Sequence, residues 1–189
     1  MKIIVNPLNP GDVIRTHPEK GFWGCAVVLS SADSTQDSYP RCHIAVLDLM
    51  KKRKYAWKNI NIDEHDIVNL NYKVRVAPFE YIQAPSPQLS VGIYTLRKIG
   101  SLDIIATVNP KEIYSKPLTF EVGDGTSGTF PLCGPIPDNL GYQAVINWRK
   151  INDAVNFESE SQKNAAQFEG MERKRLAAQR EKYKLRNST

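Results

Sequence analysis

The side chains best suited to nucleophilic or acid–base chemistry in this sequence are three histidines and three cysteines. His17 precedes Pro18 in a turn-like stretch, His43 directly follows Cys42 in an apolar run, and His65 lies in an acidic run. Because neighbouring residues of a strand point to opposite faces, Cys42 and His43 are not expected to share a proton or a ligand. We therefore expect no catalytic residue and no enzyme activity, with Cys42 as a buried structural cysteine.

Two segments contain residue types that bind ions. Asp63-Glu64-His65-Asp66 combines carboxylates with an imidazole, but the spacing matches neither an EF-hand loop nor a zinc motif. The segment 123–128, GDGTSG, lacks the Gly-Lys-Ser/Thr of a nucleotide-binding loop. We predict a solvated turn and a structural loop here, with no metal ion and no cofactor. If the acidic cluster is functional, it meets a cationic patch on a protein partner.

Residues 51–58 interleave five cations with Tyr55 and Trp57. Cations that contact phosphates and rings that stack on bases are together typical of proteins that bind single-stranded nucleic acid. The same residues also suit the exposed end of a hairpin, where long cationic stems cover a strand edge. Both interpretations stay open.

A β-rich body is expected to position these side chains. Short runs of β-branched or aromatic residues between turn formers predict strands at 2–5, 12–15, 23–29, 43–49 and 72–76. The runs 91–98 and 102–108 flank Gly100-Ser101, which predicts a type II′ hairpin. The glycines and prolines of 123–137 predict a long loop, and 142–151 fits either a short strand or a helix.

The last part of the chain has the composition of a helix. From Ala154 to about Arg186 it is rich in Ala, Gln, Glu, Lys and Arg and has no proline, and Glu169 with Arg173 forms a favourable i,i+4 pair. We expect Gly170 to kink or divide this helix. Its thin apolar stripe indicates a helix that docks lightly or projects into solvent; the stripe contains Phe157, Ala165, Phe168, Met171 and Leu176.

Together these patterns predict an α+β protein. A mainly β binding domain over residues 1–150, a small SH3-like or twisted antiparallel barrel or sheet, precedes a charged helical tail over 151–189. Residues 149–189, with ten Lys or Arg and six Asp or Glu, hold most of the net charge of +5. Three widely spaced cysteines favour free thiols in a reducing compartment, so we expect a cytoplasmic protein. No export signal is visible, and no apolar run approaches the roughly 20 residues that a membrane-spanning helix needs.

The segment 10–15, PGDVIR, followed by the segment 21–28, GFWGCAVV, resembles the start of the Imm26-type bacterial immunity proteins. In that family a Gly-Asp-x-Val strand start is followed by a glycine and aromatic run that ends in a valine-rich strand. Gly11 would permit a tight entry into the first strand, and Gly24 a close backbone approach or a bulge. The resemblance covers about the first 50 residues, extends more weakly over the strand-rich body to about residue 122, and excludes the basic tail.

The resemblance implies a stoichiometric inhibitor of a secreted bacterial toxin in a polymorphic or contact-dependent competition system. Such a protein needs a complementary surface with aromatic anchors and no cofactor, and it would act as a monomer or a dimer. The candidate partner-binding residues, all expected to be exposed, are Phe22, Trp23, Tyr55, Trp57, Asp63, Glu64 and Asp66. The alternative is a small nucleic-acid-binding module that uses residues 51–58 and the basic C-terminal helix.

Overall fold

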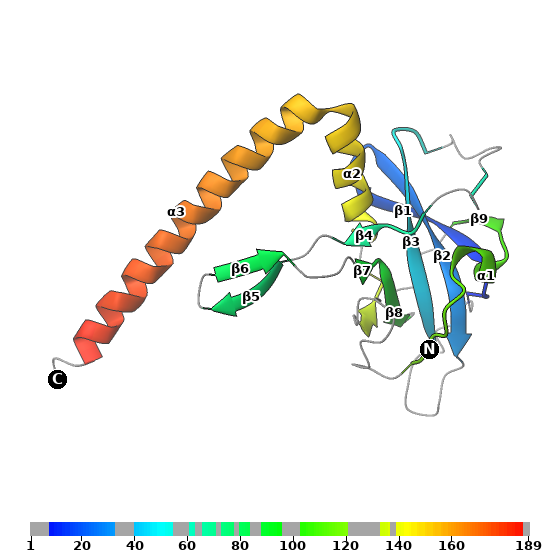
Figure 1. Ribbon diagram of the computed structural model, residues 1–189, viewed down its shortest axis with the longest axis horizontal. Coiled ribbons are helices and arrows are strands. Elements are labelled where there is room, and N and C mark those ends of the chain that lie inside the picture. The colour runs from blue at the N-terminus through cyan, green and yellow to red at the C-terminus, as the bar shows by residue number, and fades with distance from the viewer. Residues whose placement is uncertain are drawn as a thin grey trace, which may run out of the picture. The chain divides into compact units, whose positions relative to one another are not determined.

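The computed structural model describes residues 8–32, 40–54, 61–62, 66–70, 73–77, 80–83, 88–95, 103–120, 133–136 and 139–186 (Figure 1). The chain divides into two compact units, Met1–Asn147 and Trp148–Thr189. The strand predicted at residues 2–5 lies outside the described residues.

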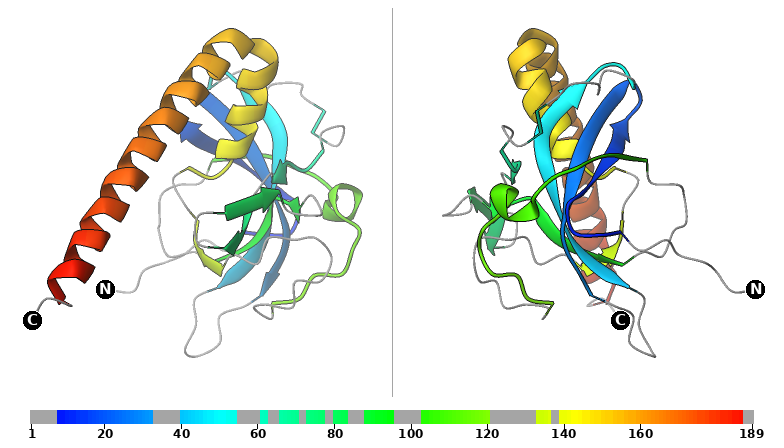
Figure 2. Two further views of the ribbon diagram at one scale, coloured as in Figure 1. Left: turned by 60° about the vertical axis from the view of Figure 1, so that its left-hand side comes forward. Right: turned by 90° about the vertical axis from the view of Figure 1, so that its right-hand side faces the viewer.

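The first unit is built on a six-stranded sheet with the order β10-β8-β3-β2-β1-β9. All neighbouring strands are antiparallel except β10 and β8, which are parallel. Figure 2 shows the twist of its three long strands. Among the described strands the sheet is open, so the fold is the predicted twisted sheet and not a closed barrel. The strands are β1 Asp12–Glu19, β2 Phe22–Ala32, β3 Arg41–Lys51, β8 Val91–Thr95, β9 Ile104–Thr107 and β10 Cys133–Pro135.

The remaining elements are short strand pairs and three helices. Strand β4 (Asn69–Leu70) pairs with β7 (Gln88–Leu89), and β5 (Lys73–Ala77) pairs with β6 (Glu80–Gln83). The helices are α1 Pro110–Ile113, α2 Tyr142–Asn152 and α3 Ala154–Arg186. The predicted strand at 72–76 is therefore confirmed as β5, and the ambiguous segment 142–151 is a helix.

Both faces of the central strands are covered, which explains why β2 and β3 are buried at almost every position. One face carries the main core, including Val13, Cys25, Val27 and Leu47. On the opposite face the start of α2 contributes buried Ala144 and Val145. Here the Asn147 side-chain amide donates to Asp48 Oδ2 at 2.9 Å, which ties α2 to β3. The sheet is thus a rigid frame for the side chains at its ends.

Gly11 has the role that the sequence predicts, and Gly24 lies at a close contact of a different kind. Gly11 has a positive φ of 94°, and a Cβ there would collide with the Val108 carbonyl oxygen. A Cβ at Gly24 would lie 2.7 Å from Thr16 Oγ1 and 2.9 Å from Met50 Cε, and the register of β2 against β3 shifts between Gly24 and Ala26. Gly24 therefore leaves room for the side chains of Thr16 and Met50, and it lies beside a register shift of the two strands.

The predicted hairpin over 91–108 is wrong. Strand β8 pairs with β3, whereas β9 pairs with β1 at the other side of the sheet, so the two strands are not neighbours. The backbone N–H and C=O groups of β8 and β9 instead pair with those of β3 and β1, the two outer strands of the β1–β2–β3 meander. The predicted loop over 123–137 is also corrected in part, because Cys133–Pro135 forms strand β10 against β8.

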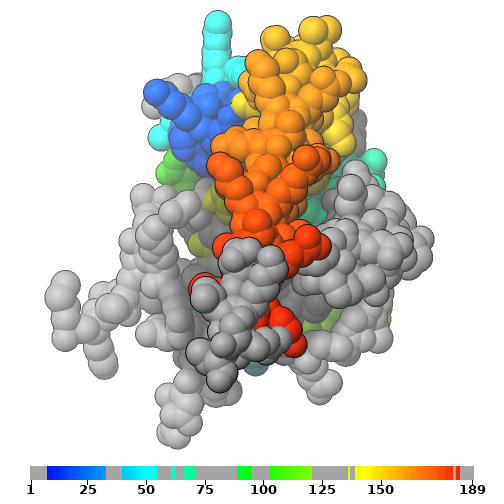
Figure 3. Space-filling view, turned by 90° about the vertical axis from the view of Figure 1, so that its left-hand side faces the viewer, coloured from blue at the N-terminus to red at the C-terminus, as the bar shows by residue number. Residues whose placement is uncertain are grey.

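The second unit contains the end of α2 and the whole of α3, which confirms the predicted C-terminal helix. The two helices meet in a bend at Asp153, whose N–H donates to the Arg149 carbonyl at 2.8 Å. Across the bend, Arg149 pairs with Glu160 at 3.3 Å and Lys150 Nζ lies 5.9 Å from the centre of the Phe157 ring. Helix α3 continues through Gly170 without a break, so the expected division there is wrong. Figure 3 draws α3 in space-filling form, from its yellow-orange start toward its red end.

Candidate partner-binding surface

Cationic and aromatic side chains gather at the end of the sheet where β1 turns into β2 and where β3 ends. Trp23 of β2 is directly opposite Lys51 of β3. Since every second residue of a strand points to the same face, Trp23 shares its face with the core residue Cys25, and Lys51 shares its face with the core residue Leu49. The face that carries the core thus continues outward as a polar surface. We call this end the basic aromatic surface; it comprises Arg15, His17, Trp23, Lys51, Lys52, Arg53, Lys54 and Asp103.

A stacked pair of rings forms the centre of the basic aromatic surface. The rings of His17 and Trp23 lie 3.9 Å apart between centroids, with an angle of 20° between their planes. His17 is exposed and Trp23 is half-buried. Because β1 and β2 are adjacent strands of the sheet, this stack is held in place before any partner arrives, and little conformational entropy is lost on binding.

Asp103 organises the cations beside the stack. Its Oδ2 accepts a hydrogen bond from Arg15 Nη1 at 2.7 Å and lies 3.9 Å from Lys54 Nζ. Its backbone carbonyl also accepts from the Arg15 N–H at 2.9 Å. The Arg15 side chain is only 14% exposed, and its buried Nε has no hydrogen-bond partner among the described residues. Arg15 is therefore a fixed cation, whereas Lys54 extends past Asp103 and lies 5.4 Å from the Trp23 ring.

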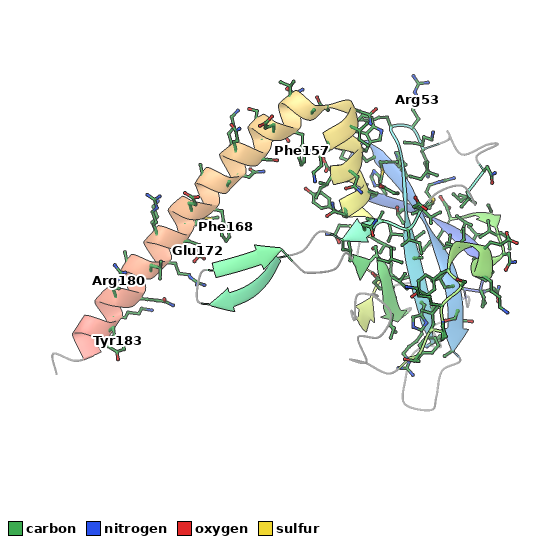
Figure 4. The ribbon with its side chains drawn as sticks, in the orientation of Figure 1. Arg53, Phe157, Phe168, Glu172, Arg180 and Tyr183 are labelled. Atoms are coloured by element: carbon green, nitrogen blue, oxygen red, sulfur yellow. The ribbon has the colours of Figure 1, made fainter. Side chains whose placement is uncertain are left out.

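The turn after β3 adds consecutive positive charges. The Lys52 ammonium lies 3.7 Å from the centre of the Phe22 ring, and this contact holds the start of the turn against the sheet. Arg53 is exposed and projects away from the strands (Figure 4). A cluster of this kind attracts an anionic partner through its field, and its central rings supply contact area.

The structure places only some of the predicted partner-binding residues on this surface. Trp23 is there, but Phe22 is 3% exposed and packs beneath Lys52, so its predicted exposure is wrong. Asp66 is exposed, and its carbonyl accepts the N–H of Asp48 on the side of β3 away from β2. Tyr55, Trp57, Asp63 and Glu64 lie outside the described residues.

A second polar site, which sequence reasoning missed, lies at the opposite end of the β2–β3 pair. Ser30 Oγ lies 2.7 Å from His43 Nδ1, and His43 Nε2 lies 2.8 Å from the Thr119 carbonyl oxygen. Since a carbonyl only accepts, the neutral imidazole carries its proton on Nε2 and its Nδ1 accepts from the serine hydroxyl. No local pattern predicts this pair, because Ser30 and His43 meet only through the β2–β3 register.

Burial keeps His43 neutral. The side chain is 3% exposed, and the Phe120 ring packs on it at 4.3 Å between centroids. Burial lowers the pKa of His43, the charge of Arg41 lowers it further, and the hydrogen bond to Thr119 opposes both. The contacts of His43 with Ser30, Thr119 and Phe120 thus hold residues 119–120 against the sheet.

The thiols of Cys25 and Cys42 are unreactive in the folded protein. Cys25 and Cys42 are free and buried, and burial raises the pKa of each thiol to about 12. Both are therefore protonated at neutral pH and are poor nucleophiles. The Cys42 thiol instead makes a long contact, 3.7 Å, to the Tyr94 carbonyl oxygen.

Within the part of the chain that the structure describes, no group of three or more His, Cys, Asp or Glu side chains is placed to hold a metal ion. Likewise, no described helix combines the length and the apolar character required to cross a bilayer. Comparisons with protein-family models, with curated proteins and with solved structures found no match.

Proposed function

We propose that this protein is an immunity protein, which neutralises a bacterial toxin by placing the basic aromatic surface on an acidic region of that toxin. The observation that carries the proposal is the Trp23–His17 stack, set among cations at the end of a rigid sheet. The resemblance of residues 10–28 to the Imm26-type proteins supports the same function, since Trp23 lies within that segment.

The chemistry of the surface suits tight stoichiometric binding. Tryptophan and arginine are enriched among the residues that contribute most to binding energy at protein interfaces, particularly where they are held in place before binding. Arg15 is already oriented by Asp103, and Trp23 by His17. The exposed cations around them speed encounter with an acidic partner and contribute less to the final affinity.

The proposal is tested with the toxin encoded beside this chain, co-expressed and co-purified with it. A one-to-one complex is expected. Trp23→Ala should weaken it at least thirtyfold, which corresponds to about 2 kcal/mol, through faster dissociation. The double change Lys52→Glu with Arg53→Glu should mainly slow association.

Exposed cations elsewhere on the first unit provide the matched control. Lys111 and Lys116 are exposed, so changing both to glutamate alters net charge equally but leaves the surface intact. Equal loss of binding in both double variants would show that overall charge, and not this surface, determines affinity. Failure of the neighbouring toxin to bind at all would remove the immunity proposal.

A nucleic-acid-binding module is the second candidate. Its specific support is the run of four cations at Lys51–Lys54 beside exposed and half-buried rings, the combination that binds phosphates and stacks on bases. Binding of mixed single-stranded DNA or RNA, with an affinity that falls steeply as salt rises, would favour it. Undetectable binding at physiological salt, together with a stable toxin complex, would favour the immunity function.

A further inference from the structure

Helix α3 carries its charges unevenly along its length. Residues 154–172 contain four glutamates and one lysine, which gives a net charge of −3. Residues 173–186 contain seven cations and one glutamate, which gives +6. The two halves of the helix therefore have opposite charge.

The large exposed apolar side chains of α3 lie at its midpoint, Phe168 and Met171, and near its ends, Val155 and Tyr183. Phe168 and Met171 are 59% and 57% exposed and lie at the centre of the range Ala154–Arg186. Phe157 precedes Phe168 by about three helical turns, so the two rings project from the same side of the helix (Figure 4).

These residues belong to a seam with the spacing of a coiled coil. Alternating steps of four and three residues repeat every seven and keep one side of a helix facing a partner. The seam has large apolar side chains at Phe157, Phe168 and Met171 and smaller or polar ones at most of its other positions; it contains Phe157, Ser161, Asn164, Phe168, Met171, Arg175 and Ala178.

We propose that α3 pairs with α3 of a second copy of this chain as an antiparallel two-helix coiled coil, with its two-fold axis between Phe168 and Met171. In this register Phe168 packs on Met171 of the partner subunit, and Ser161 faces Ala178 of the partner subunit. Each half with a charge of −3 then lies beside a half with a charge of +6. Parallel pairing would instead place the two halves of +6 together.

The composition of the seam sets the strength of the dimer. Asn164 and Arg175 are polar seam residues, which fix register at a cost in stability. Arg175 already pairs with Glu172 at 3.5 Å on its own helix. Association is therefore reversible, and added salt weakens it because part of the attraction is between exposed charges.

The first experiment measures the mass of the full chain by sedimentation from about 5 to 500 µM, since mass action favours the dimer at high concentration. Wild type is expected to shift from monomer to dimer across this range, and at higher concentration in high salt. Phe168→Glu with Met171→Glu should remain monomeric throughout, with unchanged helix content by circular dichroism. Ala166→Glu with Ala177→Glu, on the opposite side of α3, adds the same charge and should leave the dimer intact.

The second experiment tests the orientation by disulfide formation in a chain that carries Cys133→Ser. A mixture of Ser161→Cys and Ala178→Cys chains should form the mixed disulfide. Ser161→Cys alone should not, because the two copies of residue 161 would be about 25 Å apart along the axis. A monomeric wild type, a dimer that survives the Phe168 and Met171 changes, or efficient coupling of Ser161→Cys to itself would each overturn the proposal. The proposal would also be overturned if the chain stayed monomeric and bound nucleic acid through the cations of residues 173–186.

Discussion

The two ends of the β2–β3 pair use similar residue types for opposite purposes. At one end His17 is exposed and stacks on Trp23, among cations that face solvent. At the other end His43 is buried, and both of its ring nitrogens have hydrogen-bond partners. The difference between the two histidines is one of environment: the buried imidazole stabilises the fold, and the exposed one remains accessible to a partner. Changes at one end should therefore alter stability, and changes at the other should alter binding.

The largest expected effect on stability is at the buried end. His43→Leu leaves the Ser30 hydroxyl and the Thr119 carbonyl without their imidazole partner, and we expect it to lower the free energy of unfolding by about 2 kcal/mol. Water can reach part of this site, because Ser30 is half-buried and Thr119 is exposed, which limits the loss. Urea unfolding of the full chain measures it. His17→Leu is the control, and an equal loss in both variants would contradict the contrast.

The largest effect on binding with little effect on stability is expected at the exposed end. Trp23→Ala should lower the affinity for the partner by about 2 kcal/mol and the free energy of unfolding by less than about 1 kcal/mol, because the ring is only half-buried. Titration calorimetry and urea unfolding of the same preparation give both values. A Trp23→Ala chain that unfolds easily but binds normally would reverse the assignment of this end.

The pH dependence of stability gives a sharper test of the buried end. Since the pKa of His43 is lowered in the folded state, the unfolded chain takes up the proton first as the pH falls through about 6.5. Stability is therefore fully present above that pH and declines below it, by at most about 1.4 kcal/mol per pH unit from this one group. The difference between wild type and His43→Gln isolates this contribution. A difference that is constant from pH 7.5 to 5.5 would mean that burial does not keep the imidazole neutral.

The smallest effect is expected at Asp103, whose side chain is 48% exposed. Asp103→Asn removes the ion pair with Arg15, and we expect it to cost no more than about 1 kcal/mol of stability. It also adds one net positive charge beside Trp23, so association with an acidic partner should become slightly faster at low salt. Stopped-flow association at two salt concentrations measures this. Slower association would indicate that the orientation of Arg15 matters more than the local field.

Local sequence patterns predicted where the strands and helices of this protein lie better than they predicted which strands pair with each other. The cores of β1, β2 and β3 were predicted because each is an apolar run between turn formers, and α3 because no proline interrupts it. The wrong hairpin over 91–108 shows the limit: Gly100-Ser101 indicates a turn, but pairing of β8 with β3 and of β9 with β1 depends on strands far away in the chain.

The candidate site divides in the same way. The cations of Lys51–Lys54 are consecutive, so the sequence alone identifies them as a basic segment. The contact between His17 and Trp23, and that between Ser30 and His43, depend on strand register, which shifts at irregularities between Thr16 and Glu19 and between Val28 and Ser30. A shift of one residue would turn each partner to the opposite face, and no local pattern fixes that shift.

The buried sulfur atoms of Cys25 and Cys42 can report when the central strands of the sheet separate. Cys25 and Cys42 lie on adjacent strands, β2 and β3, and both are inaccessible while those strands stay packed. An alkylating reagent added in excess would thus label them only in molecules whose central strands have separated. The labelling rate, followed by mass spectrometry, would measure how often these strands separate, in a crude lysate as readily as in a pure sample.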